Sequence, residues 1–441
     1  MDKRISMAIL AAIASLGLSN LALATTFNDA PGGGDWNTPA TWGGTDPLTD
    51  IPTATTDIIN ISQSLVTATA GNAAGSFSGG EIHISNNGTL QIIGPAWYTP
   101  NNSAAMEIYM NGGTFDIAGN TTVVASATKL KLDIEGVSVV RADKLQNGSL
   151  KTMAQGATLG SGGANGAQTY SLQLSGSGTM VIFAGNSYLK FGCDTSGSTP
   201  TGSTFNGILD VRSGQLQVGA ADFTNQATVI LNGDGTSLQV YSGSGLVNNL
   251  YGSGGIAFNG TGRALRIGDE LNPAGIDAGN VMDPTKAGTD PTQVGKITYS
   301  GSGKNDLIFQ SGSQLTMDVF GENDADQIVW TDTTGTSVVN FDNANLVVQM
   351  FTPGEDFVGD WTLITADVFG ANGKFLNDDG SNVTFGNNPG WTLTLDYIGD
   401  PGSRQVVLHG EYTAPSTPEP ASLALIGLGG MLLLRRRRHG A

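Results

Sequence analysis

Gly214-Gln215-Leu216-Gln217-Val218 and, further along, Ser237-Leu238-Gln239-Val240 carry the pattern from which we infer the architecture of this chain. In each segment a turn residue is followed by apolar side chains at every second position. That alternation is typical of a β-strand with one buried and one exposed face. The same pattern recurs at residues 88–92, 113–117, 178–182, 264–267 and 314–317. The sequence therefore predicts an all-β protein.

The spacing of the apolar anchors indicates how these strands are arranged. Leu90 and Phe115, Leu216 and Leu238, and Leu238 and Leu265 form three pairs with similar separations. Leu265 and Leu315 are about twice as far apart, which we interpret as two such steps. Each step falls in the twenties, a period typical of a parallel β-solenoid, in which each coil buries its inner face against its neighbours. We predict a right-handed parallel β-solenoid (β-helix).

One alternative architecture stays open. Short alternating strands also build an antiparallel β-sandwich, or several, when they follow one another every 8–12 residues or so with turns between them. Helical periodicity is nearly absent, and its best candidate is the short segment 101–110.

The chain divides into five predicted segments. Residues 1–24 have the charged start, the apolar run and the small-x-small site (Ala22, Ala24) of a secretory signal peptide, which is cleaved after Ala24. Residues 25–62 contain Trp36 and Trp42, which we expect to cap the open end of the solenoid, with sugar stacking as the alternative role. Solenoid repeats are predicted over 63–295. A β-rich block over 296–413 forms either the last coils or a second cap, and 414–441 is a linker with a tail.

The tail has three parts in a fixed order. Pro418, Glu419 and Pro420 are followed by an apolar segment, 421–434, and by a basic stop at Arg435, Arg436, Arg437 and Arg438. The apolar segment is shorter than the stretch of about 20 residues that a comfortable membrane span needs. The arginines are expected to stay on the cytoplasmic side.

This tail resembles the PEP-CTERM sorting signal of Gram-negative bacteria. The resemblance implies recognition, and cleavage near Pro418-Glu419-Pro420, by an exosortase-like membrane transpeptidase. It implies transient anchoring in the inner membrane and a final location at the cell surface or outside the cell. An ordinary C-terminal membrane anchor is the alternative.

The body carries a second, looser resemblance. The tryptophan-containing start and the later segments 326–328, 361–364 and 373–375 are similar to autotransporter-associated repeat proteins and to β-helix passenger regions. Because no segment of the length of an outer-membrane barrel follows, we do not expect a complete autotransporter.

Composition narrows the possible partners. The chain has a net charge of −18, and residues 25–417, with 14 basic and 36 acidic residues, carry −22. Such a body should repel nucleic acid, so no nucleic-acid partner is expected. The only cysteine, Cys193, rules out an intramolecular disulfide, and we interpret it as a small buried side chain.

The search for catalytic chemistry yields few candidates. Stacked coils could bring Glu81 and Glu107 close enough for a pair of hydrolytic carboxylates. A Ca²⁺ candidate is the acidic group Glu322, Asp324 and Asp326, which lacks the usual loop pattern and also fits a solvated turn. A lyase would also need a basic residue beside a Ca²⁺ site, and because basic residues are scarce, Arg263 and Arg266 are the candidates. The two body histidines, His83 and His409, are far apart in sequence and have no zinc-site spacing.

These observations predict an exported structural or adhesive protein without enzymatic activity or cofactor. Exposed Thr, Asn, Ser and Gln on stacked coils would offer hydrogen bonds to the exopolysaccharide of a biofilm. The alternative is a β-helix polysaccharide lyase or glycoside hydrolase.

Overall fold

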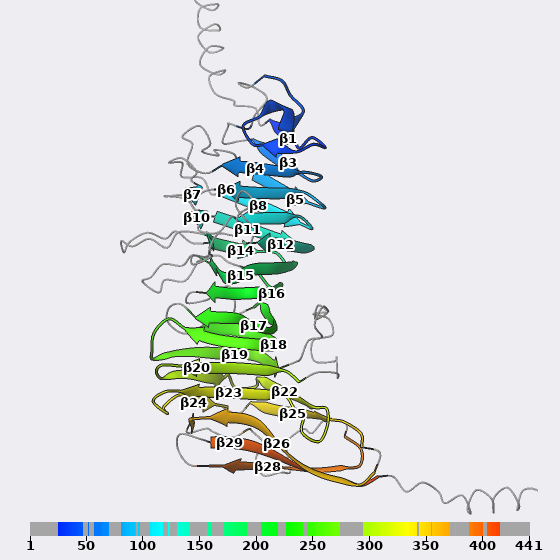
Figure 1. Ribbon diagram of the computed structural model, residues 1–441, viewed down its shortest axis with the longest axis vertical. Coiled ribbons are helices and arrows are strands. Elements are labelled where there is room, and N and C mark those ends of the chain that lie inside the picture. The colour runs from blue at the N-terminus through cyan, green and yellow to red at the C-terminus, as the bar shows by residue number, and fades with distance from the viewer. Residues whose placement is uncertain are drawn as a thin grey trace, which may run out of the picture.

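A computed structural model gives the fold as an elongated stack of β-strands that lie across its long axis (Figure 1). It describes residues 25–46, 52, 57–69, 81–93, 96–97, 106–117, 122–123, 130–141, 157–159, 172–191, 204–218, 226–240, 245–273, 294–341, 344–353, 355–370, 375, 388–399 and 404–414.

One sheet of six parallel strands runs along the N-terminal half of the stack. In spatial order these strands are β1 (Thr26–Asn28), β3 (Ile58–Ile61), β5 (Glu81–Ser85), β8 (Met106–Asn111), β11 (Leu130–Glu135) and β14 (Leu172–Ser175). Their inward side chains form a ladder in strict register: Phe27, Ile59, Ile82, Ile108, Leu132 and Leu174. Every member of this ladder is buried, because each coil covers the apolar face of the next.

The remaining described strands form a second sheet, which continues to the C-terminal end of the stack. Its N-terminal strands are β2 (Gly34–Asp35), β4 (Leu65–Thr69), β6 (Thr89–Ile93), β7 (Ala96–Trp97), β9 (Thr114–Ile117), β10 (Thr122–Val123), β12 (Val137–Arg141) and β13 (Ala157–Leu159). The long central strands are β15 (Thr179–Phe191), β16 (Ile208–Val218), β17 (Thr228–Val240), β18 (Gly245–Phe258) and β19 (Arg263–Pro273). The C-terminal strands are β20 (Lys296–Gly301), β21 (Asn305–Phe309), β22 (Gln314–Val319), β23 (Gln327–Asp332), β24 (Val338–Asn340), β25 (Asn345–Met350), β26 (Phe357–Ala366), β27 (Val368–Phe369), β28 (Trp391–Ile398) and β29 (Arg404–Tyr412).

Parallel pairing confirms the solenoid-like arrangement and contradicts the sandwich. Strands from β1 to β27 pair in parallel with the strand of the next coil, whereas a sandwich needs antiparallel neighbours. Among the described strands, antiparallel pairs join β29 to β26 and to β28 at the C-terminal end. The parallel stack crosses residue 296 without a break, because β18 pairs with β20 and β19 with β21.

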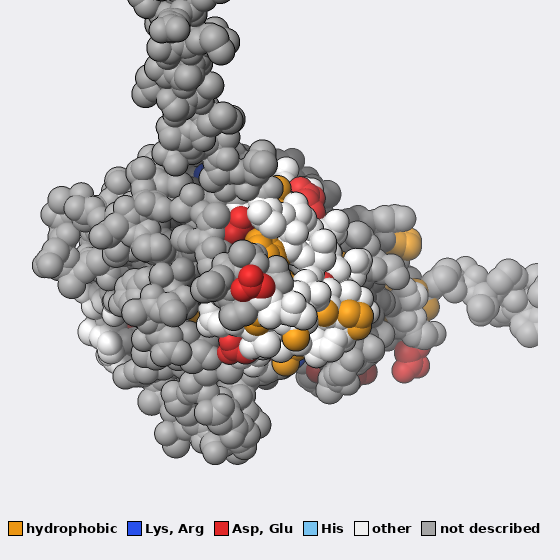
Figure 2. All heavy atoms as spheres, turned by 90° about the horizontal axis from the view of Figure 1, so that it is seen from above, with side chains coloured by type: hydrophobic (Ala, Val, Ile, Leu, Met, Phe, Trp, Pro, Cys, Tyr) orange, Lys and Arg blue, Asp and Glu red, His pale blue; other side chains and the backbone are white. Residues whose placement is uncertain are grey.

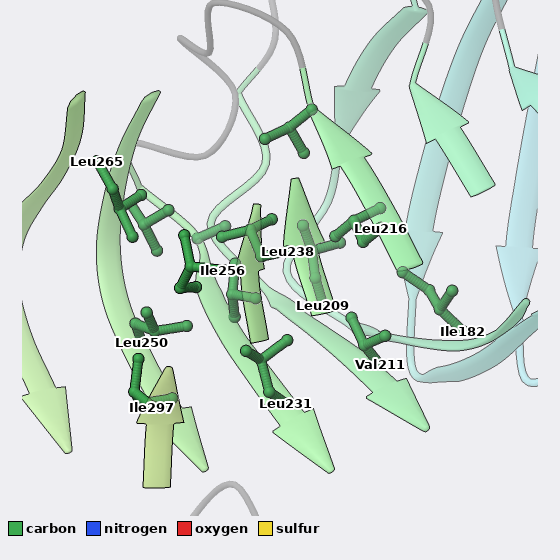
Figure 3. Close-up of a cluster of buried hydrophobic side chains, with 14 of the residues drawn as sticks. Ile182, Leu209, Val211, Leu216, Leu231, Leu238, Leu250, Ile256, Leu265 and Ile297 are labelled. Atoms are coloured by element: carbon green, nitrogen blue, oxygen red, sulfur yellow. The ribbon is translucent and has the colours of Figure 1, made fainter. Parts of the chain in front are cut away.

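The core is a set of stacked apolar ladders (Figure 3). Side chains from β15 to β20 meet between the strands, among them Leu216, Leu238 and Ile256, which are aligned in register. A second ladder joins Leu265 to Leu307.

Two of the predicted spacings are correct and two are wrong. Leu90 lies opposite Phe115, and Leu216 lies opposite Leu238. However, Leu238 pairs with Ile256, which comes before Leu265 in the sequence, and not with Leu265. Leu265 and Leu315 belong to different ladders, because Leu315 pairs with Leu271. Each coil repeats the alternating pattern on more than one face, so spacing alone does not identify the face.

The possible helix at 101–110 is also wrong over its described part. Met106–Asn111 is strand β8, with Ile108 and Met110 buried and Glu107 and Tyr109 outside. The period of two in these residues outweighs the helical pattern because the neighbouring coils supply strand partners on both sides.

Candidate functional site

Several predicted targeting residues lie outside the described residues. These are the signal-cleavage residues Ala22 and Ala24, the sorting motif Pro418, Glu419 and Pro420, and the basic stop Arg435, Arg436, Arg437 and Arg438. Cys193 is outside them as well. Within the described ranges, no helix has the length and apolarity to cross a membrane.

The two tryptophans of the N-terminal segment pack against each other. Trp36 and Trp42 are buried, and their ring centroids are 5.1 Å apart in an edge-to-face arrangement. The indole N–H of Trp42 donates to the carbonyl oxygen of Trp36 at 2.8 Å. Trp42 belongs to the short 3-10 helix η1 (Pro39–Trp42) and also contacts Phe27 of the first strand. Figure 2 shows this end of the stack from above, with acidic and apolar side chains scattered among uncharged atoms.

Asp29 is a structural residue that sequence reasoning missed. Its carboxylate accepts hydrogen bonds from the backbone N–H groups of Ser62, Gln63 and Ser64 at 2.7–3.0 Å, and from the Ser64 hydroxyl at 2.6 Å. Burial raises the pKa of Asp29, but these hydrogen bonds outweigh it and hold the pKa below its usual range. The carboxylate thus joins the first coil to the second, and its partners are so distant in sequence that no local signal reveals them.

The predicted carboxylate pair does come together. Glu81 of β5 and Glu107 of β8 lie opposite each other on neighbouring parallel strands, whose backbones are about 4.8 Å apart. Lys131 of β11 occupies the same row and forms an ion pair with Glu107. Stacking therefore places two carboxylates and an ammonium group on the outer face of one sheet.

A parallel row runs beside this one, two residues further along each strand. It contains Asn60, His83, Tyr109, Asp133 and Ser175. The rings of His83 and Tyr109 stack with centroids 4.7 Å apart, so each ring covers one face of the other. The hydroxyl of Ser175 donates to Asp133 at 2.6 Å. We call the two rows together the outer polar ladder.

Hydrogen bonds within the outer polar ladder shift the pKa values of two of its members, Glu107 and Tyr109. The Tyr109 hydroxyl donates to Glu107 at 2.6 Å, and His83 Nε2 lies 3.1 Å from a Glu81 oxygen. Hydrogen bonds from Lys131 and Tyr109 hold the pKa of Glu107 below its usual range, whereas the bond to Glu107 raises the pKa of Tyr109. Glu107 therefore stays ionised and Tyr109 stays protonated. A glycosidase acid needs a raised carboxyl pKa, which Glu107 does not have, and a tyrosine that acts as a lyase base needs a lowered pKa, which Tyr109 does not have.

Tyr109 and Lys131 were not among the residues singled out from the sequence. A usable signal exists, because the segments Glu81-Ile82-His83-Ile84 and Glu107-Ile108-Tyr109-Met110 repeat the same pattern. When the two segments are aligned as strands of neighbouring coils, each residue lies opposite the partner that it has in the structure.

The three residues of the acidic Ca²⁺ candidate lie in two different environments. Glu322 and Asp324 are exposed in a turn, whereas Asp326 is fully buried and accepts the backbone N–H groups of Gly295 and Asp318 at 2.7 and 2.9 Å. Burial raises the pKa of Asp326 to about 8 despite these two hydrogen bonds. Over the described ranges, no three His, Cys, Asp or Glu side chains gather in a way that could hold a metal ion. Asp326 instead fixes the base of the turn to the preceding coil.

The two arginines considered as lyase cations both lie on β19. Arg263 is half-buried and Arg266 is exposed.

Two other arginines pack on an aromatic ring. The guanidinium groups of Arg141 and Arg212 lie over the ring of Phe183, at 4.6 and 5.9 Å from its centroid. Arg212 also pairs with the buried Asp210 at 2.9 Å. This cluster joins β12, β15 and β16 through packing and charge.

His409 joins three antiparallel strands at the C-terminal end. Its Nδ1 lies 2.5 Å from Asp360 of β26, and its Nε2 lies 3.1 Å from Asp396 of β28. The hydrogen bond to Asp360 raises the pKa of His409; burial opposes this rise, and the charges of Asp360 and Asp396 and the hydrogen bond to Asp396 add to it.

A last polar group covers β18, β19 and β22. The Glu270 carboxylate accepts hydrogen bonds from the hydroxyls of Tyr251 (2.8 Å) and Thr316 (2.5 Å) and from the amide of Gln314 (3.2 Å). Asp318, two residues beyond Thr316, is buried, and burial together with the charge of Glu270 raises its pKa to about 7.

Comparison with known proteins identifies one segment. The family model of the PEP-CTERM protein-sorting motif matches residues 416–438. No curated protein and no solved structure matches the chain. The chain therefore carries a PEP-CTERM sorting motif at the end of a β-rich body of parallel strands, and it is exported and sorted by an exosortase.

Proposed function

We propose that this exported protein is a structural or adhesive component of the cell surface or the extracellular matrix, associated with exopolysaccharide. The observation that carries the proposal is the outer polar ladder. Its side chains repeat at the spacing of the coils and bond to one another, which makes a rigid, regular, hydrogen-bonding surface. A repeating polymer with many hydroxyl groups can match such a surface at several points at once.

Retention by polysaccharide tests this proposal. The mature protein is mixed with the exopolysaccharide of the producing cells, and the fraction that sediments with the polymer is measured. The triple variant Asn60→Ala, His83→Ala, Asp133→Ala removes three of the five side chains of one row of the ladder and should reduce retention at least tenfold. The matched control Thr392→Ala, Thr394→Ala changes exposed residues on β28 and should bind like the wild type. Equal retention of both variants, or none by the wild type, would contradict a role for the ladder.

The sorting motif supports a proposal about the fate of the tail. The apolar segment 421–434 would hold the protein in the inner membrane for a short time, with the arginines on the cytoplasmic side, until exosortase cleaves near Pro418-Glu419-Pro420. Mass spectrometry of the protein recovered from the cell surface should then find no peptide containing Arg435–Arg438. Recovery of that peptide would indicate a permanent anchor.

We also propose that the solenoid is right-handed and capped at both ends. Parallel strands joined by crossovers in one sheet favour the right-handed connection. At the N-terminal end, Trp36, Trp42 and Phe27 would shield the first coil from water and from pairing with another chain. At the C-terminal end, antiparallel β28 and β29 would do the same, with Trp391 packed against Trp361 at 5.8 Å. An experimental structure of residues 25–413 checks handedness and caps together.

A polysaccharide lyase or glycoside hydrolase remains the second candidate, and the proximity of Glu81 to Glu107 is what favours it. We nevertheless propose that the protein is not an enzyme, because Glu107, bonded to Lys131 and Tyr109, lacks the raised pKa of a glycosidase acid, and Tyr109 lacks the lowered pKa of a tyrosine base. Incubation with acidic and neutral polysaccharides should release neither new reducing ends nor unsaturated products. Release that is lost in Glu107→Gln would establish the enzyme instead.

A further inference from the structure

The outward face of β18, β19 and β22 holds more oxygen acceptors than donors. We define the acceptor face by the outward side chains Asn249, Tyr251, Glu270, Asn272, Gln314, Thr316 and Asp318. Register places Asn249, Glu270 and Gln314 in one row, and Tyr251 lies opposite Asn272. The inward residues between them, Leu250, Leu271 and Leu315, belong to the core, so the seven polar side chains lie on the other side of the sheet.

Three oxygens on this face are buried without a hydrogen-bond donor among the described residues: Oδ1 of Asn249, Oδ1 of Asn272 and Oδ1 of Asp318. Asn272 is 2% exposed and Asp318 is 5% exposed. A buried acceptor that lacks a donor costs free energy, and a buried carboxylate costs more. In addition, no described ion pair supplies a cation to Asp318 or to the neighbouring Glu270.

The type of atom and the burial together define the missing partner. All of the unsatisfied atoms are carboxylate or amide oxygens, which are ligands of hard cations. A sugar ring would not reach side chains that are 2–5% exposed, whereas an ion would. Leu271 pairs with Leu315, so the next residue of β19, Asn272, lies beside the next residue of β22, Thr316. Asp318 is the outward residue that follows Thr316 on β22. The hydrogen bond from Thr316 brings Glu270 to the same place.

We propose that the acceptor face binds one Ca²⁺ ion, with Asp318 and Asn272 as ligands and Glu270 as the second negative charge. Only two carboxylates take part, so this site differs from a cluster of three or more acidic, His or Cys side chains, which the described residues do not form. Mg²⁺ demands a stricter octahedron and keeps its waters, so this set of amide and carboxylate oxygens favours Ca²⁺. The bound ion would hold β19 to β22, whose residues Glu270 and Gln314 pair although they are distant in sequence.

Direct binding tests the site. Equilibrium dialysis of the mature protein against ⁴⁵Ca²⁺ should find a site with Kd of about 10⁻⁴–10⁻³ M, the range of extracellular calcium modules. Asp318→Asn should weaken this binding at least tenfold, and an equal concentration of Mg²⁺ should not displace the ion. The control Asp324→Asn removes a nearby exposed carboxylate of the 321–324 turn and should leave binding unchanged.

Two further measurements separate binding from folding. Asp318→Asn keeps the shape of the side chain, so its guanidinium unfolding midpoint without Ca²⁺ should equal or exceed that of the wild type. Should it fail to fold, Glu270→Gln replaces it and should also weaken binding. At a Ca²⁺ concentration 100 times Kd, the folded-to-unfolded ratio of the wild type should rise about 100-fold. No Ca²⁺ bound at ten times the expected Kd, or equal binding by wild type and Asp318→Asn, would overturn the proposal.

Discussion

Close packing between coils is tested most directly at Gly88, which lies at the corner before β6. A Cβ atom added there would lie 2.1 Å from the carbonyl oxygen of Ile61 in the preceding coil, and 2.4 Å from its carbonyl carbon. Ordinary contact begins at 3.4 Å, so Gly88→Ala forces the two coils about 1.3 Å apart at this point.

The cost of this displacement follows from the hydrogen bonds beside it. Thr89 N–H donates to Ser64 at 2.9 Å, and Thr114 N–H donates to Gly88 at 2.9 Å. Opening the first of these by the same amount exceeds the hydrogen-bond range and loses about 0.5–1.5 kcal/mol. Overpacking adds about 1–3 kcal/mol, so we expect Gly88→Ala to lower the free energy of unfolding by about 2–4 kcal/mol.

Guanidinium unfolding followed by tryptophan fluorescence measures this loss. The matched control is Gly235→Ala, because an added Cβ there has no atom within 4 Å and the backbone is not in the left-handed region. The control should be neutral or stabilising by up to about 1 kcal/mol. If Gly88→Ala and Gly235→Ala unfold at the same midpoint, the inference that coil contact at the corner requires glycine is wrong.

Three other predictions concern the core, the outer polar ladder and the C-terminal strands. Leu238→Ala, in the middle of the buried ladder, should cost about 2–5 kcal/mol of unfolding free energy, measured by the same assay. Lys131→Met should return the pKa of Glu107 toward its ordinary range, since the strongest hydrogen bond to its carboxylate is removed, and a carboxyl-carbon NMR titration measures the rise. Because Asp360 and Asp396 raise the pKa of His409, protonated His409 stabilises the fold below about pH 6.5, the pKa of an unperturbed histidine. This contribution is lost as the pH rises through the higher folded-state pKa, and it is below about 1 kcal/mol for such an exposed pair. The variant His409→Gln should abolish this part of the pH dependence of unfolding, and an unchanged profile would contradict it.

The all-β class could be predicted because it depends on local alternation, and the parallel stack because the Leu90–Phe115 and Leu216–Leu238 separations are true coil steps. Leu216-Gln217-Val218 and Leu238-Gln239-Val240 show which side chains turn inward in any strand that contains them. The same alternation could not assign Leu265 to its ladder. Leu238 meets Ile256 after a short connection, but Ile256 meets Tyr299 only after a much longer one. Loops of unequal length between strands change the number of residues between ladder neighbours without changing which side chains lie opposite each other.

The candidate site was predictable to the same degree. Glu81 and Glu107 could be proposed as neighbours because the coils in this part of the chain have nearly equal lengths. The lowered pKa of Glu107 could not, because its bond to Lys131 exists only in the observed register between β8 and β11.

The sequence by itself determined the destination of the protein and its strand-rich class, because a sorting motif and an alternating pattern are local properties of the chain. The tertiary structure alone decided which side chains meet. Asp29 bonds to Ser64 of the next coil, and Asp318 is buried near Glu270 without a donor for one of its oxygens. Such contacts depend on the register between coils, which is set when all coils bury their apolar ladders together and not by any one segment.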